Sequence, residues 1–198
     1  MFNDETQNVV SLPPMEDTNG LFREQYRINS ARRAGYDYSQ GGSYFITICT
    51  KNRQPYFGEI QPATTRADAW LAGTQLAARA WECWQQIPQH FPFVEADAFV
   101  VMPDHMHGIL IINRPADYAE QAAPHFGPQS NNLASIVRGF KVGVKGWATQ
   151  NKLPFEWQAG YYDRVIRNEI ELEKSRAYIQ SNPNRWESDK QNELSIFR

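Results

Sequence analysis

Cysteine is scarce in this chain of 198 residues, which contains two, Cys49 and Cys83. Two thiols are too few for a disulfide framework, so we expect both to be buried and reduced. Long hydrophobic runs are missing as well: no segment approaches membrane-spanning length, and the N-terminus lacks the pattern of a secretory signal. These absences predict a cytoplasmic protein with no membrane partner.

A basic excess is also lacking. Lys and Arg number 20 against 22 Asp and Glu, which gives a net charge of −2, whereas nucleic-acid-binding domains are often strongly basic. The distribution of charge is more informative than its sum. No Asp or Glu occurs from Phe126 to Phe155, and Arg138, Lys141 and Lys145 share one helix face within that segment. We call these three residues the basic stripe; it is either a solvated helix face or a DNA-binding surface.

The composition, with 41% hydrophobic and 13% aromatic residues, is typical of a chain that forms one hydrophobic core. We expect a flexible N-terminal arm over residues 1–25, a single domain over 26–190 and a C-terminal tail over 191–198. Residues 114–131, rich in Ala, Pro, Gln and Asn, are expected to form a loop.

Residue patterns within the domain predict both helices and strands. Strands are expected at 43–50, twice within 95–112 and at 161–167, and helices at 65–89, 132–150 and from 168 onward. This β-α-β-β-α-β-α order predicts an α+β fold with a central antiparallel sheet and packed helices.

Two of the four histidines, His105 and His107, stand at i and i+2 among β-branched and aromatic residues that favour a strand. Alternate side chains of a strand share a face, so both imidazoles should point the same way and Met106 into the opposite layer. Two neutral imidazoles side by side bind a divalent cation well. The alternative is one histidine in the core and one on the surface; their pairing on one face favours a metal site.

A second candidate group lies near the C-terminus. Asn168 and Glu171 have the spacing of a capping box, and the helix that they begin should end near Pro183. On this helix Tyr178 and Asn182 are one turn apart. Each alone would be unremarkable, as a half-buried tyrosine and a helix cap. Together with two histidines, they would place a nucleophile beside a neutral oxygen ligand suited to Mg²⁺ or Mn²⁺.

Several strings of the chain, in this order, resemble the HUH single-tyrosine transposases, and most closely their REP-associated branch. The likeness covers about residues 27–188. It is carried by Gly35–Tyr38, Tyr44–Thr50, His105–His107, Trp157–Gln158, Asp163–Arg167 and Tyr178–Pro183. One position departs from the pattern, because Tyr162 stands where the resemblance implies a histidine.

The resemblance implies a ferredoxin-like HUH endonuclease fold and a site made of four residues. His105, His107 and Asn182 match the family's metal ligands, and Tyr178 matches its nucleophile. The implied function is that of a single-stranded DNA endonuclease and strand transferase, a transposase that acts on DNA hairpins through a 5′-phosphotyrosine intermediate with Mg²⁺ or Mn²⁺. Hairpin DNA is the expected partner, and a homodimer is left open.

Candidates for contact with DNA phosphates are Arg138, Lys141, Lys145, Arg164, Arg167, Arg32 and Arg33, with Tyr36 and Tyr38 as stacking residues. Two other functions compete with the transposase. A metal-dependent hydrolase would use water as its nucleophile and form no covalent adduct with DNA. A catalytically inactive, domesticated hairpin-binding module would keep the fold and have no need of Tyr178.

Overall fold

The computed structural model describes residues 41–65, 68–114 and 131–191. Its elements are strands β1 (Gly42–Cys49), β2 (Gly58–Gln61), β3 (Trp70–Gly73), β4 (Val94–Val101), β5 (His105–Ile112) and β6 (Tyr162–Ile166), the short 3-10 helix η1 (Lys51–Arg53), and helices α1 (Gln75–Gln85), α2 (Ile87–His90), α4 (Leu133–Gln150) and α5 (Glu169–Gln191). The main sheet has the order β4-β5-β1-β6 with every neighbouring pair antiparallel, and β2 pairs with β3 in a separate hairpin.

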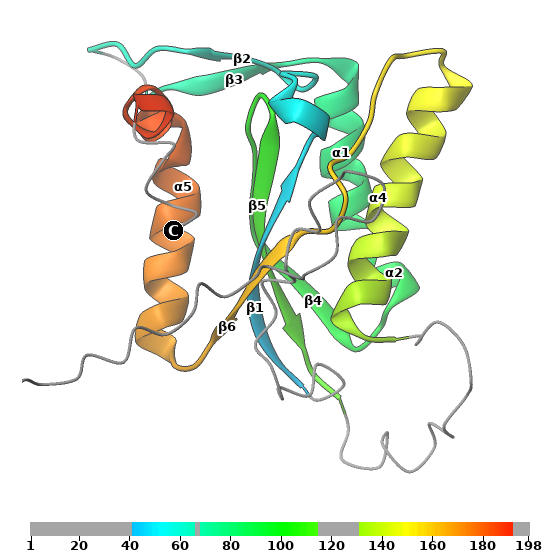
Figure 1. The fold of residues 1–198 in the computed structure, drawn as a ribbon. Helices are drawn as coiled ribbons and strands as arrows, with labels where there is room; N and C mark the ends of the chain where they lie inside the picture. Colours follow the sequence, from blue (N-terminus) through cyan, green and yellow to red (C-terminus); the bar gives the residue numbers. More distant parts are fainter. Residues whose placement is uncertain (1–40, 66–67, 115–130, 192–198) are drawn as a thin grey trace, which may run out of the picture. The chain divides into compact units, whose positions relative to one another are not determined.

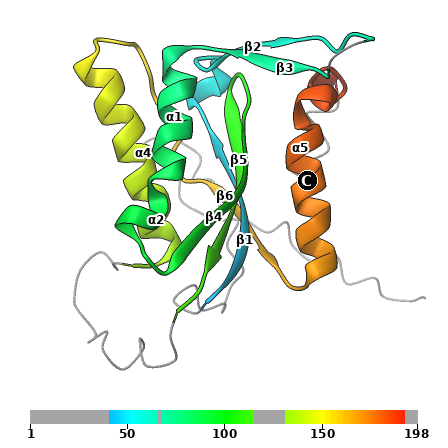
Figure 2. The same ribbon diagram turned by 180° about the vertical axis from the view of Figure 1, so that it is seen from behind.

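Helices cover both faces of the main sheet. Helices α1, α2 and α4 lie on one face, and α5 lies on the other (Figures 1 and 2). The larger hydrophobic core fills the α1/α4 side, and a smaller cluster of Ile109, Ile166, Leu172 and Ile179 lies beneath α5. The central strands β5 and β1 are therefore buried from both sides.

Alternate side chains of β5 pack into opposite layers of the fold. Met106, Leu110 and Ile112 belong to the larger core, whereas Ile109 packs in the cluster under α5. His105 and His107 share the face of Ile109, because side chains two residues apart lie on one side of a strand. The predicted opposition of Met106 to the histidines is confirmed.

The predicted fold class is confirmed: the structure is α+β with a central antiparallel sheet, and β1, the β4–β5 pair, α4, β6 and α5 begin within a few residues of their predicted starts. Both cysteines are buried and free, as expected. Within the described ranges, none of the helices combines the length and the apolar character that a membrane span requires.

The helix predicted over 65–89 is wrong in its first third. The β2–β3 hairpin occupies this region, and α1 begins only after Thr74, whose hydroxyl caps the helix by accepting from the Ala77 backbone N–H. A hydroxyl at the N-cap satisfies one of the orphan donors of a helix start, which fixes where α1 begins. At its C-terminal side the helix is interrupted after Gln85, and α2 follows.

Helix α5 does not end near Pro183 as predicted, and instead continues to Gln191 with the proline inside it. Proline lacks the N–H that would bond the carbonyl of Ile179, so one helical hydrogen bond is missing at this position. In Figure 1 the red end of α5 turns away from the axis of its orange part, as expected of a proline kink. The chain thus bends at Pro183 without leaving the helix.

Some predictions lie outside the described residues. These are the arm over 1–25, most of the loop over 114–131, all but the first residue of the tail over 191–198, and the four residues Arg32, Arg33, Tyr36 and Tyr38.

The strand that carries the histidines is supported from behind by a tryptophan. A Cβ atom added at Gly108 would lie 2.4 Å from the ring of Trp84, which is buried and stacked on Phe99 at 4.4 Å. We therefore predict that Gly108→Ala lowers the free energy of unfolding by about 1–3 kcal/mol, the usual cost of overpacking a core. Urea denaturation would measure it.

Gly146→Ala is the matched control, because a Cβ at Gly146 meets nothing within 4 Å. Its position in the interior of α4 should make this variant as stable as the wild type or more stable, by up to about 1 kcal/mol. Equal stability of the two variants would show that Trp84 does not restrict position 108.

Candidate active site

The turn between β4 and β5 sets the position of the first histidine. The Asp104 carbonyl accepts from both the backbone N–H and the hydroxyl of Thr50, each at 2.9 Å, and the Pro103 carbonyl accepts from the Phe57 N–H at 3.0 Å. The Met102 N–H closes the turn by donating to the His105 carbonyl at 2.9 Å. Backbone bonds on successive residues leave Asp104 and His105 little freedom.

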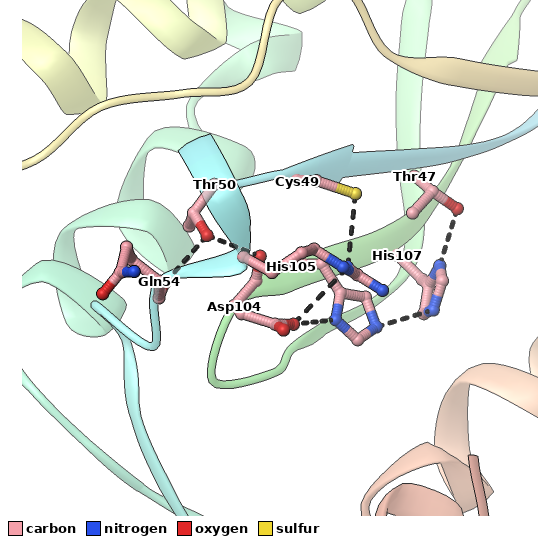
Figure 3. Close-up of polar contacts among 8 residues, drawn as sticks. Thr47, Cys49, Thr50, Gln54, Asp104, His105 and His107 are labelled. Carbon is pink, nitrogen blue, oxygen red and sulfur yellow. Dashed lines mark hydrogen bonds and ion pairs between the residues drawn. The ribbon is translucent and has the colours of Figure 1, made fainter. Parts of the chain in front are cut away.

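Both imidazoles are buried and face each other. The Nε2 atoms of His105 and His107 lie 3.1 Å apart, and each ring is supported on its other nitrogen. Nδ1 of His105 lies 2.6 Å from the Asp104 carboxylate, and Nδ1 of His107 lies 2.8 Å from the Thr47 hydroxyl. Figure 3 shows the resulting chain from Asp104 through the two rings to Thr47.

These outer contacts determine which nitrogens can bind a cation. A carboxylate only accepts hydrogen bonds, so His105 must carry a proton on Nδ1, and its Nε2 then presents a lone pair unless the ring is doubly protonated. Burial, the neighbouring His105 and the Arg53 charge, in this order, hold the pKa of His107 well below its usual range. His107 is thus neutral near pH 7, and one of its nitrogens also presents a lone pair.

Arg53 extends this series of hydrogen bonds beyond Asp104. Its guanidinium donates to the Asp104 carboxylate at 3.5 Å and to the Cys49 sulfur at 3.3 Å. Burial, the largest influence, raises the pKa of the Cys49 thiol, so Cys49 accepts this hydrogen bond as a neutral thiol. Arg53 and Asp104 together fix the orientation of His105.

Helix α5 brings the tyrosine to this strand. It begins with Asn168, whose side-chain oxygen accepts from the Glu171 N–H at 2.9 Å. The Glu171 carboxylate accepts from the N–H of Arg167, one residue earlier than a standard capping box requires. Two turns further on, the ring of Tyr178 lies against that of His107, with centroids 5.3 Å apart, and against Phe45 at 5.9 Å.

Asn182 lies between two residues that touch the histidines. Tyr178, one turn earlier, contacts His107, and Trp186, one turn later, stacks on His105 with ring centroids 5.8 Å apart. The Asn182 side chain is 2% exposed, and its Nδ2 has no hydrogen-bond partner. Because amide oxygen and nitrogen are assigned from their partners, this unsatisfied position suits an amide oxygen turned toward a cation.

These observations fit a divalent metal ion. Among the described residues, no three side chains of His, Cys, Asp or Glu converge on one point, so a third protein ligand has to be of another type. The amide of Asn182 is a candidate, because it lies one helical turn from each of the two residues whose rings contact His107 and His105. Two nitrogens and one neutral oxygen leave positions open for water and for substrate.

The sequence patterns did not indicate Arg185 and Trp186 as site residues, because they placed the end of the helix near Pro183. The guanidinium carbon of Arg185 lies 5.9 Å from the ring centroid of Tyr178. The signal that could have found these residues is helical spacing, since Arg185 is seven residues and Trp186 eight residues after Tyr178.

The remaining candidates divide between the two faces of the sheet. Arg164 lies on the α5 side, over the Phe45 ring at 5.7 Å, and donates to the Ser175 hydroxyl at 3.1 Å. Arg167 is exposed just before α5. Tyr162 occupies the cross-strand row of Thr47 and His107, which places it on the face of the histidines.

The basic stripe lies on α4, across the sheet from Tyr178 (Figure 2). Lys141 donates to the carbonyls of Gln158 and Gly160 at 2.7 and 2.8 Å, and Lys145 donates to the carbonyl of Phe155. Burial, the main cause, lowers the pKa of Lys141. These two lysines hold the segment that leads into β6, whereas Arg138 is exposed. The structure does not bring the stripe together with the histidines.

Comparison with known proteins places the chain in a family. A protein of Haemophilus influenzae named as uncharacterised is 39% identical over 169 residues, which cover 81% of this chain and 90% of that protein. A second protein of the same organism, named "Putative REP-associated tyrosine transposase", is 24% identical over 153 residues, covering 74% of this chain and 73% of its own length. No protein-family model matches the chain.

A solved structure shares the fold. It is a REP-associated tyrosine transposase bound to a REP hairpin, with a TM-score of 0.50 and 21% identity over 77% of this chain and 72% of that one. The chain thus has the fold of a REP-associated tyrosine transposase. The chain belongs to one family with the 39%-identical protein of Haemophilus influenzae, and the resemblance to the REP-associated tyrosine transposases drawn from its sequence is confirmed.

The contacts of the basic stripe can be tested through stability. Lys141→Ala would leave two carbonyls without a charged donor, so we predict a loss of about 1–3 kcal/mol in the free energy of unfolding. Arg138→Ala, the exposed control on the same helix, should change it by less than about 0.5 kcal/mol. Equal stability of the two variants in urea denaturation would contradict a structural role for Lys141.

Proposed function

We propose that this protein is a single-stranded DNA endonuclease and strand transferase that cleaves hairpin DNA and becomes joined to it through Tyr178. The observation that carries the proposal is the contact of the Tyr178 ring with His107 at 5.3 Å, beside the facing nitrogens of the two histidines. A phenol next to a pair of metal-binding nitrogens is the arrangement that nucleophilic attack on a metal-bound phosphate requires. The hairpin bound by the solved relative supports hairpin DNA as the substrate.

The proposed step exchanges one phosphodiester for another. The phenol oxygen of Tyr178 attacks the scissile phosphorus in line, the bond from phosphorus to the 3′ oxygen breaks, and a 5′-phosphotyrosine remains. The phenol gives up its proton to water, and the departing 3′ oxygen takes up a proton to become a hydroxyl. Because the ester bond is conserved, a 3′-hydroxyl of another strand can reverse the step and join the strands without ATP.

Three side chains would hold a divalent ion, which we propose to be Mg²⁺ or Mn²⁺. They are His105, His107 and Asn182. Bound there, the ion would polarise a phosphate oxygen and neutralise charge that develops as the phosphorus is attacked. Asp104 and Thr47 would hold the imidazole rings in the correct orientation, as outer partners of metal-binding histidines commonly do.

The single strand would approach over the α5 side of the sheet. Arg164 lies on this side, and Arg167 is exposed directly before α5; these two are the described members of the predicted phosphate contacts that fit the site. The basic stripe on α4 faces the other layer, and two of its members are used within the fold. We therefore assign phosphate contact to Arg164 and Arg167 in preference to the basic stripe.

Replacing the nucleophile should separate cleavage from binding. We predict that Tyr178→Phe abolishes the covalent adduct with a hairpin oligonucleotide, seen as a band stable in denaturing gels, and leaves hairpin affinity within about threefold. Tyr161→Phe is the matched control, because Tyr161 packs against the larger core on the other side of the sheet. This control should form the adduct at the wild-type rate.

The same experiment distinguishes the competing functions. Cleavage by Tyr178→Phe without an adduct would indicate a hydrolase that activates water. Tight binding by the wild type with neither cleavage nor adduct would indicate a hairpin-binding module. Either result would overturn the proposal.

Metal binding can be measured without DNA, by titration calorimetry with Mn²⁺. His105→Ala and His107→Ala should each abolish detectable binding, whereas Met106→Leu, on the opposite face of the strand, should bind as the wild type does. Asp104→Asn keeps the shape of the side chain but loses the charge beside His105, and should weaken binding by about 10–100-fold. Wild-type affinity in both alanine variants would remove the histidines from the metal site.

A further inference from the structure

The part of α5 beyond Pro183 reaches three different parts of the site region with three consecutive residues. Asn184 bonds to the segment that leads into β3, Arg185 lies over the Tyr178 ring, and Trp186 stacks on His105. This segment therefore forms part of the site. The proposed function, which uses His105, His107, Asn182 and Tyr178, gives its residues no role.

Arg185 is held in place from both sides. On one side, the Asn184 side chain accepts from the Ala69 N–H at 2.8 Å and donates to the Asp68 carboxylate at 3.3 Å. On the other side, the ring of Trp186 is buried against His105. A residue between two anchored neighbours on a helix has its backbone fixed, so the Arg185 guanidinium remains close to the Tyr178 ring, 5.9 Å from its centroid.

The Arg185 guanidinium lies close to the place that the scissile phosphate would occupy. Attack by the Tyr178 oxygen requires the scissile phosphate at the edge of this ring, and the product phosphate stays bonded to that oxygen. An arginine presents a planar fork of N–H donors that matches two phosphate oxygens. We propose that Arg185 binds the scissile phosphate beside Tyr178 and stabilises the charge that develops on it during transfer, an assignment that rests on the proposed function.

Two other arginines on or near α5 are used differently. Arg176 forms an ion pair with Asp97 at 2.7 Å, which ties α5 to β4, and another with Glu173 on α5 itself at 2.6 Å. Arg164 donates to the Ser175 hydroxyl and lies over Phe45. Of the three, Arg185 is the arginine whose guanidinium lies over the nucleophile itself.

A purely structural role would have Arg185 hold the Tyr178 ring by a cation–π contact. The two roles differ in what they predict when the charge of the phosphate is removed. A methylphosphonate at the scissile position has the shape of the phosphodiester but no negative charge. If Arg185 binds the phosphate, the effects of the protein and DNA changes must be coupled; if it only packs, they must add.

The first measurement is hairpin affinity in the Tyr178→Phe background, which prevents reaction, and in a chelator, which removes divalent ions. The methylphosphonate is placed where the wild-type protein becomes joined to DNA. With Arg185 present, the neutral linkage should weaken binding roughly tenfold. In Tyr178→Phe/Arg185→Gln the neutral and charged hairpins should bind alike. An equal loss in both backgrounds would overturn the assignment.

The second measurement is the rate of adduct formation at saturating hairpin. Arg185→Gln should slow it on the order of 100-fold, as removal of one donor to a developing charge commonly does, and Arg185→Lys should recover part of the rate. Arg79→Gln, a charge loss on α1 on the other side of the sheet, is the matched control and should react as the wild type does. A wild-type rate in Arg185→Gln would overturn the assignment while leaving the proposed function intact. A wild-type protein that forms no adduct at all would overturn both.

Discussion

Two imidazole nitrogens 3.1 Å apart, Nε2 of His105 and Nε2 of His107, set the constraint on which the rest of the site depends. Two lone pairs at this distance repel each other unless a proton or a cation lies between or beside them. The fold keeps the rings together by supporting each from outside, with Asp104 on one side and Thr47 on the other. These supports come from the turn between β4 and β5, which backbone hydrogen bonds hold in place, and from the neighbouring central strand β1. The geometry therefore follows from the sheet together with this tight turn.

The central place of β5 makes this arrangement rigid. Strands β1 and β4 pair with it on either side, and Gly108 allows the buried Trp84 ring to pack directly on its rear face. On the front face, the rings of Tyr178 and Trp186 reach the histidines from two turns of α5 that lie on either side of Asn182. A displacement of the strand would disturb both layers, which is why a site on central strands is more precise than one on loops.

Local patterns in the sequence predicted the order of elements and the main residues of the site. They could not predict the contacts that depend on strand register and on packing between elements. The i, i+2 spacing of the histidines and the i, i+4 spacing of Tyr178 and Asn182 follow from strand and helix periodicity, and the order of elements followed from the same patterns. The support of His107 by Thr47 depends on the register of β1 against β5, which no local pattern contains. The continuation of α5 through Pro183 depends on contacts beyond it, where Asn184 and Trp186 anchor the helix end.

The basic stripe shows why helical spacing alone is a weak guide to function. Spacing establishes that Arg138, Lys141 and Lys145 share a face, but the neighbour of that face is decided by tertiary packing. Here Lys141 and Lys145 donate to the backbone carbonyls of Gln158, Gly160 and Phe155. A lysine bonded within the fold is less available to a phosphate than one without such bonds. If a protein with a net charge of −2 acts on DNA as proposed, cations close to the reacting phosphate matter more than the total charge, and on the helix that carries Tyr178 such cations would have the greatest effect.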